Sequence, residues 1–187
     1  YQQSKEQRVK DLAIMFGRGV TLATMKAIYG ERHLGLYLSA LIQAGDILLP
    51  QLKDFGGPKP TVVPVGIDQD PHLRLTRDLA FKFRKSNFIQ PSSTYHKLIK
   101  ALDGSPKMSK RSPMTYFTLE DSPEVISKKI SLSFTGGRAT AEEQRRLGAN
   151  PDICPVYDLY LFHYFERDED VAKLCNQECK GGKILCG

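Results

Sequence analysis

The sequence predicts an α/β protein in which strands and helices alternate as far as residue 120, followed by a region of helices alone. Two patterns carry this prediction. A short β-branched run at 61–66 leads through a tight loop into a helical pattern over 72–85, which is half of a βαβ unit. Beyond residue 120, the recognisable signals mark helices. The 187 residues suffice for one domain, or for one domain and part of a second.

The run Thr61–Gly66 has the composition of a strand that is buried on both faces of a parallel sheet. Pro64 cannot donate a hydrogen bond within a sheet, so we place it near the end of this strand. Asp70 suits the N-cap of the following helix, with Pro71 at its first position. Apolar residues at helical spacing then line one face of that helix: Leu75, Leu79 and Phe83.

Further segments before residue 120 have recognisable patterns. Apolar residues at helical spacing predict a helix over 31–44 that ends at Gly45. Glycine and proline predict a loop over 52–60 and a turn over 103–106. Two short segments, 87–89 and 95–102, are strand candidates.

The last third of the chain carries helix signals. Ser122 before Pro123 predicts a helix start, and Thr140 with Glu143 forms a capping box whose helix ends at Gly148.

An apolar, aromatic-rich helix is predicted over 156–165, and we expect its aromatic rings to form helical core. Stacking of these rings on RNA bases is the alternative. The change of pattern divides the chain into a domain over 1–120 and the start of a helical domain over 121–187.

Composition limits the class of protein. Hydrophobic residues make up 41% and charged residues 26%, the balance of a folded, soluble chain. No stretch reaches the roughly 18 apolar residues of a membrane-spanning helix, and the N-terminal segment lacks the apolar core of a secretion signal. We therefore expect a cytoplasmic protein with no membrane partner. Because the sequence opens without a methionine, we expect a piece of a longer polypeptide.

The net charge of +6 is unevenly distributed. Residues 72–111 include ten basic and two acidic side chains, a balance of +8. Such a local field suits ligands that carry phosphate, either nucleotides or nucleic acid. A solvated basic helix face is the alternative.

The four cysteines lie in the last quarter of the chain, separated by 20, 3 and 6 residues. Only Cys175 and Cys179 have a spacing that would place two thiols on one helix face. Free thiols are the favoured interpretation, and whether these two and Cys186 hold a metal ion is left open. The four histidines show no ligand spacing, so we expect no catalytic zinc.

The first candidate site is the loop 66–70, between the predicted strand and helix. Ligands of open parallel sheets bind at this edge. Gly66 lets the backbone approach a ligand, Asp68 can accept hydrogen bonds from ribose hydroxyls or hold an amine, and Gln69 offers both a donor and an acceptor. Asp70 is assigned only a capping role. The alternative is a loop that does nothing but cap and turn.

The second candidate site is Lys107-Met108-Ser109-Lys110, with Arg111 behind it, on the loop that follows the predicted turn. Lysines on such a loop can neutralise the charge of a polyphosphate as its leaving group departs. An exposed basic loop without a function is the alternative.

Further matches occur in order along the chain. Residues 107–111, KMSKR, are similar to the KMSKS signature of class I aminoacyl-tRNA synthetases. Two further stretches are PVGIDQDPHLRLTRD at residues 64–78 and FTGGR at residues 134–138. The second stretch is followed by EEQR at 142–145 and by Gly148. The ordered set, with the Cys-x₆-Cys ending, resembles tryptophanyl-tRNA synthetases of the archaeal and eukaryotic branch.

This resemblance implies the C-terminal half of a Rossmann-like catalytic domain with a parallel sheet, followed by an all-helical anticodon-binding region. It implies ATP-dependent activation of tryptophan to tryptophanyl-adenylate and transfer to tRNA(Trp), with Mg²⁺ as a cofactor. It also implies a homodimer for the full-length protein.

The resemblance assigns roles residue by residue. Lys107 and Lys110 are the expected catalytic residues, which hold the phosphates in the activation transition state. Gln69 is expected at the α-amino end of tryptophan, and Gln43 matches a glutamine near the amino-acid pocket. Arg111 replaces the commoner serine and receives no role. The expected ATP-binding residues are Gly66, Asp68, Lys107, Met108, Ser109 and Lys110.

One expected element does not occur among the 187 residues: the H-x-G-H-type motif with which class I synthetases bind ATP. We therefore expect that this chain alone does not activate tryptophan. A tyrosyl-tRNA synthetase, a synthetase-derived binding module without catalysis and a general nucleotidylyl transferase are alternatives. Residues 134–138 and the Asp68-Gln69 pair favour tryptophan.

Overall fold

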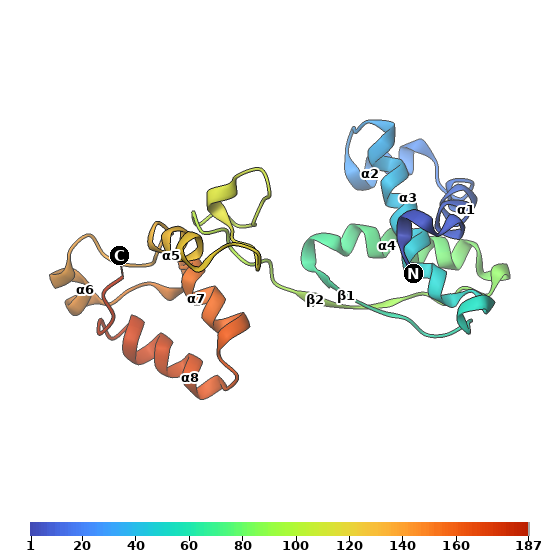
Figure 1. Cartoon of the computed structure of the whole chain (residues 1–187). Helices are drawn as coiled ribbons and strands as arrows, with labels where there is room; N and C mark the ends of the chain where they lie inside the picture. The colour runs from blue at the N-terminus through green and yellow to red at the C-terminus, as the bar shows by residue number, and fades with distance from the viewer. Residues whose placement is uncertain (187) are drawn as a thin grey trace. The chain divides into compact units, whose positions relative to one another are not determined.

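A computed structural model describes residues 1–186. It separates into two compact units, one over residues 1–97 and one from residue 98 onward (Figure 1). The functional boundary expected near residue 120, between a catalytic and an anticodon-binding domain, stays a prediction.

The first unit has the alternating strands and helices that the sequence predicts. A parallel β-strand pair is joined through a helix, and further helices precede it. Its main elements are α1 (Gln7–Gly17), α2 (Leu22–Tyr29), α3 (Leu34–Leu48), β1 (Val62–Gly66), α4 (Asp70–Lys82) and β2 (Ser92–His96).

The two strands run parallel, with Val62 opposite Ser92 and Gly66 opposite His96, so the predicted βαβ unit is confirmed. Pro64 lies in the middle of β1, so its placement near the strand end was wrong. The Ser92 N–H donates to the Thr61 carbonyl at 2.9 Å. Because bonding residues alternate along a parallel strand, residue 64 faces away from β2, and its missing N–H costs this pairing nothing.

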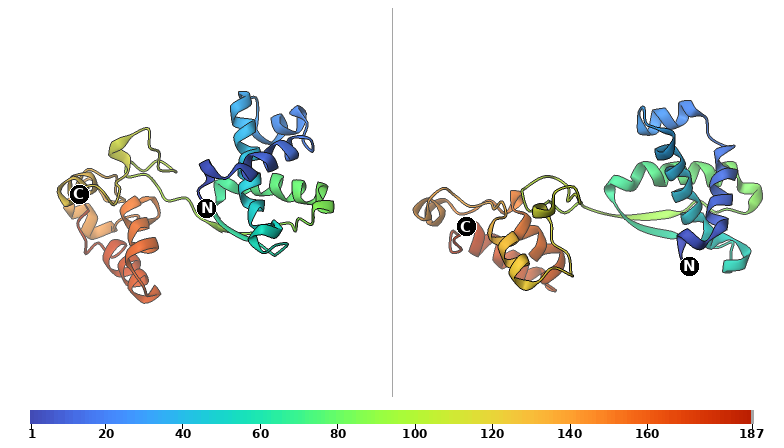
Figure 2. Two further views of the ribbon diagram at one scale, coloured as in Figure 1. Left: turned by 45° about the vertical axis from the view of Figure 1, so that its right-hand side comes forward. Right: turned by 45° about the horizontal axis from the view of Figure 1, so that its top comes forward.

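Other strand predictions need correction. β1 is not buried on both faces, because Val62 is 61% exposed. The described sheet has only two strands, and Figures 1 and 2 show the helices of this unit on one side of them. Residues 87–89 form no strand, and β2 occupies 92–96 instead of 95–102.

The core of the first unit forms where α1 packs on α3 and α3 packs on α4. Phe16, Leu48 and Leu79 are completely buried there. Gly45 does not end the helix as predicted, since α3 continues to Leu48. A Cβ at this position would lie 2.6 Å from the Val9 carbonyl oxygen, so this glycine serves the close approach of α1 and α3.

The second unit is helical apart from its loops, and its helices are shorter. They are α5 (Pro123–Ser131), α6 (Ala141–Leu147), α7 (Pro155–Leu159) and α8 (Asp168–Lys173), with π-helical turns at Tyr160–Tyr164 and Leu174–Cys179.

The predicted helix starts of this unit are confirmed. The Ser122 hydroxyl accepts the Val125 N–H, and the Thr140 hydroxyl accepts the Glu143 N–H at 3.2 Å. Gly148 ends α6 with a φ of 68°, a conformation that favours glycine.

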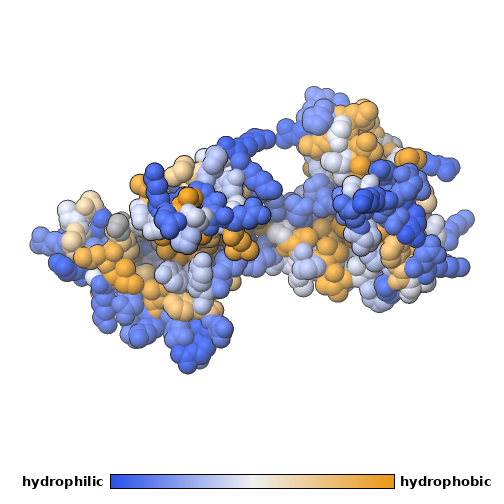
Figure 3. All heavy atoms as spheres, viewed as in Figure 1, coloured by the Kyte–Doolittle hydropathy of each residue, from blue (hydrophilic) through white to orange (hydrophobic). Residues whose placement is uncertain are grey.

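The aromatic segment departs from its prediction as helical core. Tyr160 and Tyr164 are 42% and 62% exposed. The Tyr160 ring instead stacks on Phe165, with 5.4 Å between ring centroids. These rings thus pack on one another at the surface, and Figure 3 shows apolar side chains exposed on this unit. No helix in residues 1–186 is long and apolar enough to cross a bilayer.

Candidate functional site

The loop after β1 is very short. The strand ends at Gly66, a 3₁₀ turn covers Ile67–Gln69, and α4 begins at Asp70. Gly66, Asp68 and Gln69 therefore lie together at the carboxyl end of a parallel strand. This is the edge at which open α/β sheets bind ligands.

The structure joins the two glutamines that the sequence assigns to the amino-acid pocket. Gln43 on α3 donates from its Nε2 to the Oε1 of Gln69, at 2.9 Å. Both side chains are half-buried. The remaining polar ends of the pair, the Gln43 Oε1 and the Gln69 Nε2, have no hydrogen bond within the described residues. One acceptor and one donor are thus left for a ligand.

Asp70 is not the N-cap that the sequence predicts, because it is the first residue of α4 itself. Its carboxylate accepts the Tyr95 hydroxyl at 2.6 Å and pairs with the Arg74 guanidinium at 2.7 Å. These contacts, the Tyr95 hydrogen bond foremost, lower the pKa of the carboxyl group. Asp70 therefore ties the start of α4 to β2 and has a structural role.

A polar contact that the sequence did not suggest lies beside Asp68. The Tyr29 hydroxyl on α2 and the His72 Nδ1 on α4 are 3.0 Å apart, and their rings lie 5.0 Å apart. Burial raises the pKa of Tyr29 to about 12. Burial also lowers the pKa of His72, although the charge of Asp68 opposes this shift. No spacing pattern could reveal a contact between side chains 43 residues apart.

In the second unit, the turn at 103–106 is confirmed. The Asp103 carboxylate accepts the Ser105 N–H at 2.9 Å, which lowers its pKa. The Leu102 N–H donates to the Thr115 carbonyl at 2.8 Å and closes the loop of residues 103–114 at its base.

The lysines of this loop lie at its exposed tip. Lys107, Lys110 and Arg111 are exposed, whereas Met108 is half-buried. Within the tip, Ser109 accepts the Arg111 N–H on its hydroxyl at 3.3 Å, so it shapes the turn between the cations. The loop thus presents positive charge that can reach a bound anion.

The glycines of the FTGGR segment permit close backbone packing. A Cβ at Gly136 would lie 1.8 Å from the Asn150 carbonyl oxygen, and the Asn150 N–H donates to the Gly136 carbonyl at 2.8 Å. A Cβ at Gly137 would lie 2.9 Å from the Cys186 Cβ. The segment therefore fits only without side chains at these two positions.

Gln144 connects the rest of this region. Its Oε1 accepts the Arg138 N–H at 2.9 Å, while its Nε2 donates to the Ile184 carbonyl at 3.0 Å and to the Cys186 sulfur at 3.5 Å. Arg138 in turn donates from Nε to the Gly148 carbonyl at 2.8 Å. The sequence predicts no role for Gln144, although it belongs to the EEQR segment.

Comparison with known proteins decides the family. The family model described as tRNA synthetases class I (W and Y) matches residues 1–187. The chain belongs to this family.

The relatives of this synthetase chain include archaeal proteins. A tryptophan–tRNA ligase of Hyperthermus butylicus is 47% identical over 100% of the chain and 50% of its own length. The crystal structure of a tryptophanyl-tRNA synthetase from Aeropyrum pernix is 48% identical, with a TM-score of 0.91, over 100% of this chain and 51% of that one. The chain thus spans about half the length of these relatives.

A tyrosyl-tRNA synthetase from Aeropyrum pernix gives a weaker match. Its crystal structure is 20% identical, with a TM-score of 0.69, over 97% of this chain and 52% of that one. This likeness concerns the fold alone. Together with the family model, the matches establish the Rossmann-like class I fold that the sequence predicts.

The basic segment of the synthetase chain is partly neutralised within the protein. Arg74 pairs with Asp70, and Lys100 pairs at 2.7 Å with Asp158, whose side chain is 3% exposed. Lys82 donates to the Gly19 carbonyl at 2.8 Å. The balance of +8 therefore overstates the charge available to a ligand.

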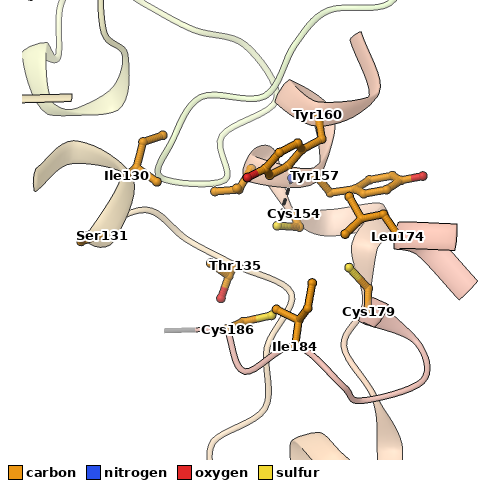
Figure 4. A pocket seen from close by; sticks show the side chains of 11 residues that line it. Ile130, Ser131, Thr135, Cys154, Tyr157, Tyr160, Leu174, Cys179, Ile184 and Cys186 are labelled. Carbon is orange, nitrogen blue, oxygen red and sulfur yellow. Dashed lines mark hydrogen bonds between the residues drawn. The ribbon is translucent and has the colours of Figure 1, made fainter. Parts of the chain in front are cut away.

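Cysteines line a cavity of about 380 Å³ in the second unit of the synthetase chain. Figure 4 shows Cys154, Cys179 and Cys186 on its walls, and all four cysteines are free thiols. Burial, with nearby cysteines, raises the pKa of Cys179 to about 11, so it is protonated at neutral pH. Among residues 1–186, no three His, Cys, Asp or Glu side chains are arranged to hold a metal ion.

Proposed function

We propose that this chain is part of a tryptophan–tRNA ligase, which activates tryptophan with ATP and transfers it to tRNA(Trp). The hydrogen bond between Gln43 and Gln69 carries the proposal, because it assembles an amino-acid-binding group at the carboxyl end of β1. The similarity to tryptophan–tRNA ligases supports the choice of amino acid.

The glutamine pair suits the polar end of an amino acid. Gln69 would contact the α-amino end of tryptophan, because its Oε1 keeps a second lone pair beside the one that accepts from Gln43. The Gln43 Oε1 is a further acceptor for the same α-ammonium group. Each glutamine fixes the other, so the pair is oriented before the ligand binds. Because the amides of Gln43 and Gln69 are neutral, they form no ion pair with the tryptophan carboxylate, which can then act as the nucleophile.

The ATP ribose is assigned to Gly66 and Asp68, in the same short loop. A carboxylate is a suitable acceptor for ribose hydroxyls, and the adjoining glycine allows a close approach of the backbone. With both groups bound at one loop, the ribose would lie next to the amino-acid end, as attack on the α-phosphorus requires.

Lys107 and Lys110 would act on the phosphates. In the activation step, a tryptophan carboxylate oxygen bonds to the α-phosphorus, and the bond to the bridging oxygen of the β-phosphate breaks. Pyrophosphate leaves with that electron pair, and lysine charges stabilise the growing negative charge. Met108 and Ser109 would contact ATP from the same loop.

In the transfer step, a ribose hydroxyl at the 3′ end of tRNA attacks the activated carbonyl, and AMP leaves. The helical part of the second unit, from residue 121, is assigned to anticodon binding. Mg²⁺ would be carried mainly by the ATP phosphates, in keeping with its preference for retained waters and phosphate oxygens. A cytoplasmic location and a homodimer of the full-length protein complete the proposal.

The central test is Lys110→Ala in the full-length enzyme, with Lys128→Ala on the exposed face of α5 as the control. We expect tryptophan-dependent ATP–pyrophosphate exchange to fall by about 10²- to 10³-fold, because a charge contact to the transition state is lost. Tryptophan affinity and the control rate should barely change. An unchanged exchange rate for Lys110→Ala would remove the assigned role.

Amino-acid specificity separates the two members of the family. The full-length enzyme should catalyse exchange with tryptophan and show no comparable exchange with tyrosine. Gln69→Met should weaken tryptophan binding, because it removes the amide oxygen that would face the α-ammonium group and breaks the hydrogen bond to Gln43. Preference for tyrosine would overturn the proposed substrate.

A further inference from the structure

The loop of residues 103–114 has a base that is held from outside the loop. Gly104 has a φ of 84°, and the Phe134 ring covers it so closely that a Cβ there would lie 2.8 Å from the ring. The Phe134 N–H also donates to the Leu102 carbonyl at 2.7 Å. One residue of the FTGGR segment thus touches the loop base with both its ring and its backbone.

Leu102 links the contacts at this base. It is 1% exposed, and its N–H and carbonyl are both used, toward Thr115 and Phe134 respectively. The Ala101 N–H donates to the Ser105 carbonyl at 2.9 Å and the Gly104 N–H to the Ala101 carbonyl at 2.8 Å. The base is therefore fixed, while the tip with Lys107 and Lys110 is exposed.

The Phe134 side chain contributes little to the general core, because the residue is 44% exposed. Its neighbours in the FTGGR segment have different contacts, with Gly136 against Asn150 and Gly137 against Cys186. The contact of its ring with Gly104 thus has no counterpart elsewhere in that segment.

We propose that Phe134 is a positioning residue for the lysine-bearing loop. Its ring on Gly104 and its N–H on Leu102 set the direction in which the loop leaves its base, and hence where Lys107 and Lys110 can reach. A fixed base leaves only the tip free to move onto a ligand. The inference about loop geometry stands on these contacts, and its catalytic consequence rests on the proposed function.

Limited trypsin digestion of the 187-residue chain tests the loop geometry. Phe134→Ala should speed cleavage after Lys107, Lys110 and Arg111 by about three- to tenfold relative to cleavage after Arg84, because cleavage follows the population of open loop. Leu132→Ala is the matched control, since this neighbour is 66% exposed and makes none of the hydrogen bonds that hold the loop base. It should leave cleavage unchanged.

Two further variants test the contact between the Phe134 ring and Gly104 if Phe134→Ala disturbs folding. Phe134→Tyr keeps the ring and should retain the slow cleavage. Gly104→Ala should also speed cleavage, because its Cβ would meet the ring and the φ of 84° strains any residue other than glycine. Loop cleavage in folded Phe134→Ala equal to wild type, or fast cleavage in Phe134→Tyr, would overturn the proposal.

Kinetics of the full-length enzyme test the catalytic consequence. Phe134→Ala should lower kcat for pyrophosphate exchange about tenfold with little change in the KM for tryptophan, and Phe134→Tyr should restore it. Normal kcat with a loosened loop would overturn the positioning role. If Lys110→Ala leaves exchange unchanged, the proposed function fails instead, while the digestion results still report on the loop.

Discussion

At the scale of single residues, Gln144 shows how one amide can join three parts of the chain. Its side chain belongs to a residue only 2% exposed, and it binds the FTGGR backbone on one side and the segment near Cys186 on the other. Buried amides of this kind stabilise a fold only while each partner is satisfied. These hydrogen bonds explain why a buried glutamine lies beside the FTGGR segment.

Gln144→Leu tests this connection. The change keeps the volume roughly but leaves the Arg138 N–H and the Ile184 carbonyl without partners, so it should lower the free energy of unfolding by about 2–4 kcal/mol. Urea unfolding of the 187-residue chain, followed by hydrogen exchange in α6, measures it. Gln177→Leu at an exposed site should have an effect below about 0.5 kcal/mol. Equal effects of both changes would contradict the role of Gln144.

The half-buried His72 predicts a pH dependence of stability. Its pKa lies below the ordinary value of 6.5 because burial disfavours the charged ring. Between the pKa of His72 in the folded chain and its ordinary pKa, the unfolded chain binds more protons than the folded chain. The contribution of neutral His72 to stability is therefore present above about pH 6.5 and is lost as the pH falls through the folded-state pKa. Urea midpoints from pH 7.5 down to pH 5 should fall more steeply for wild type than for His72→Gln. Parallel profiles would contradict this account.

At the scale of elements, two helical glycines look alike in the sequence but differ in packing. Gly17 at the end of α1 has room for a Cβ, 3.6 Å from Leu41, whereas a Cβ at Gly45 would lie 2.6 Å from the Val9 carbonyl oxygen. The intrinsic preference of a helix for alanine over glycine does not distinguish the two sites. Only the approach of α1 to α3 distinguishes them.

Alanine at each position measures this difference. Gly45→Ala should destabilise the first unit by about 1–3 kcal/mol, because the two helices must separate. Gly17→Ala should be neutral or stabilising by up to about 1 kcal/mol. Hydrogen exchange of α1 and α3 amides gives both values. Stabilisation by Gly45→Ala would show that the helices adapt without cost.

The ion pair of Lys100 with Asp158 joins the segment before the lysine loop to α7. Lys100→Met should cost about 2–3 kcal/mol of unfolding free energy, because it leaves a buried carboxylate unpaired. The double variant with Asp158→Leu should recover most of this loss. Arg167→Met, which breaks the exposed pair with Asp170, should cost less than about 1 kcal/mol. A loss in the double variant equal to the sum of the single losses would exclude coupling.

At the scale of the whole molecule, the candidate site residues divide between the two units. Gln43, Gly66, Asp68 and Gln69 belong to the first unit, and the loop with Lys107 and Lys110 belongs to the second. Within the first unit the sequence predicted the short loop between β1 and α4, because a strand pattern, a glycine and two polar residues precede a helix. The role of this loop in binding stays a prediction. The sequence could not identify Tyr29, since its contact with His72 depends on tertiary packing.

The 187 residues by themselves should show no tryptophan-dependent pyrophosphate exchange, because they contain no H-x-G-H-type motif for ATP. A polypeptide of the length of the archaeal relatives, carrying that motif, should be active in the same assay. Circular dichroism of the 187-residue chain controls for folding. Turnover by the 187 residues alone would contradict this prediction.

The sequence by itself determined the βαβ unit, the helix starts at Ser122 and Thr140 and the positions of the two candidate loops, because these depend on local periodicity, capping chemistry and turn residues. Tertiary structure decided the rest. It placed Asp70 inside α4, made Gly45 a packing position, left the Tyr160 ring at the surface and joined Gln43 to Gln69. These outcomes depend on which distant segments pack together, and a local sequence pattern does not show which distant segment it will contact.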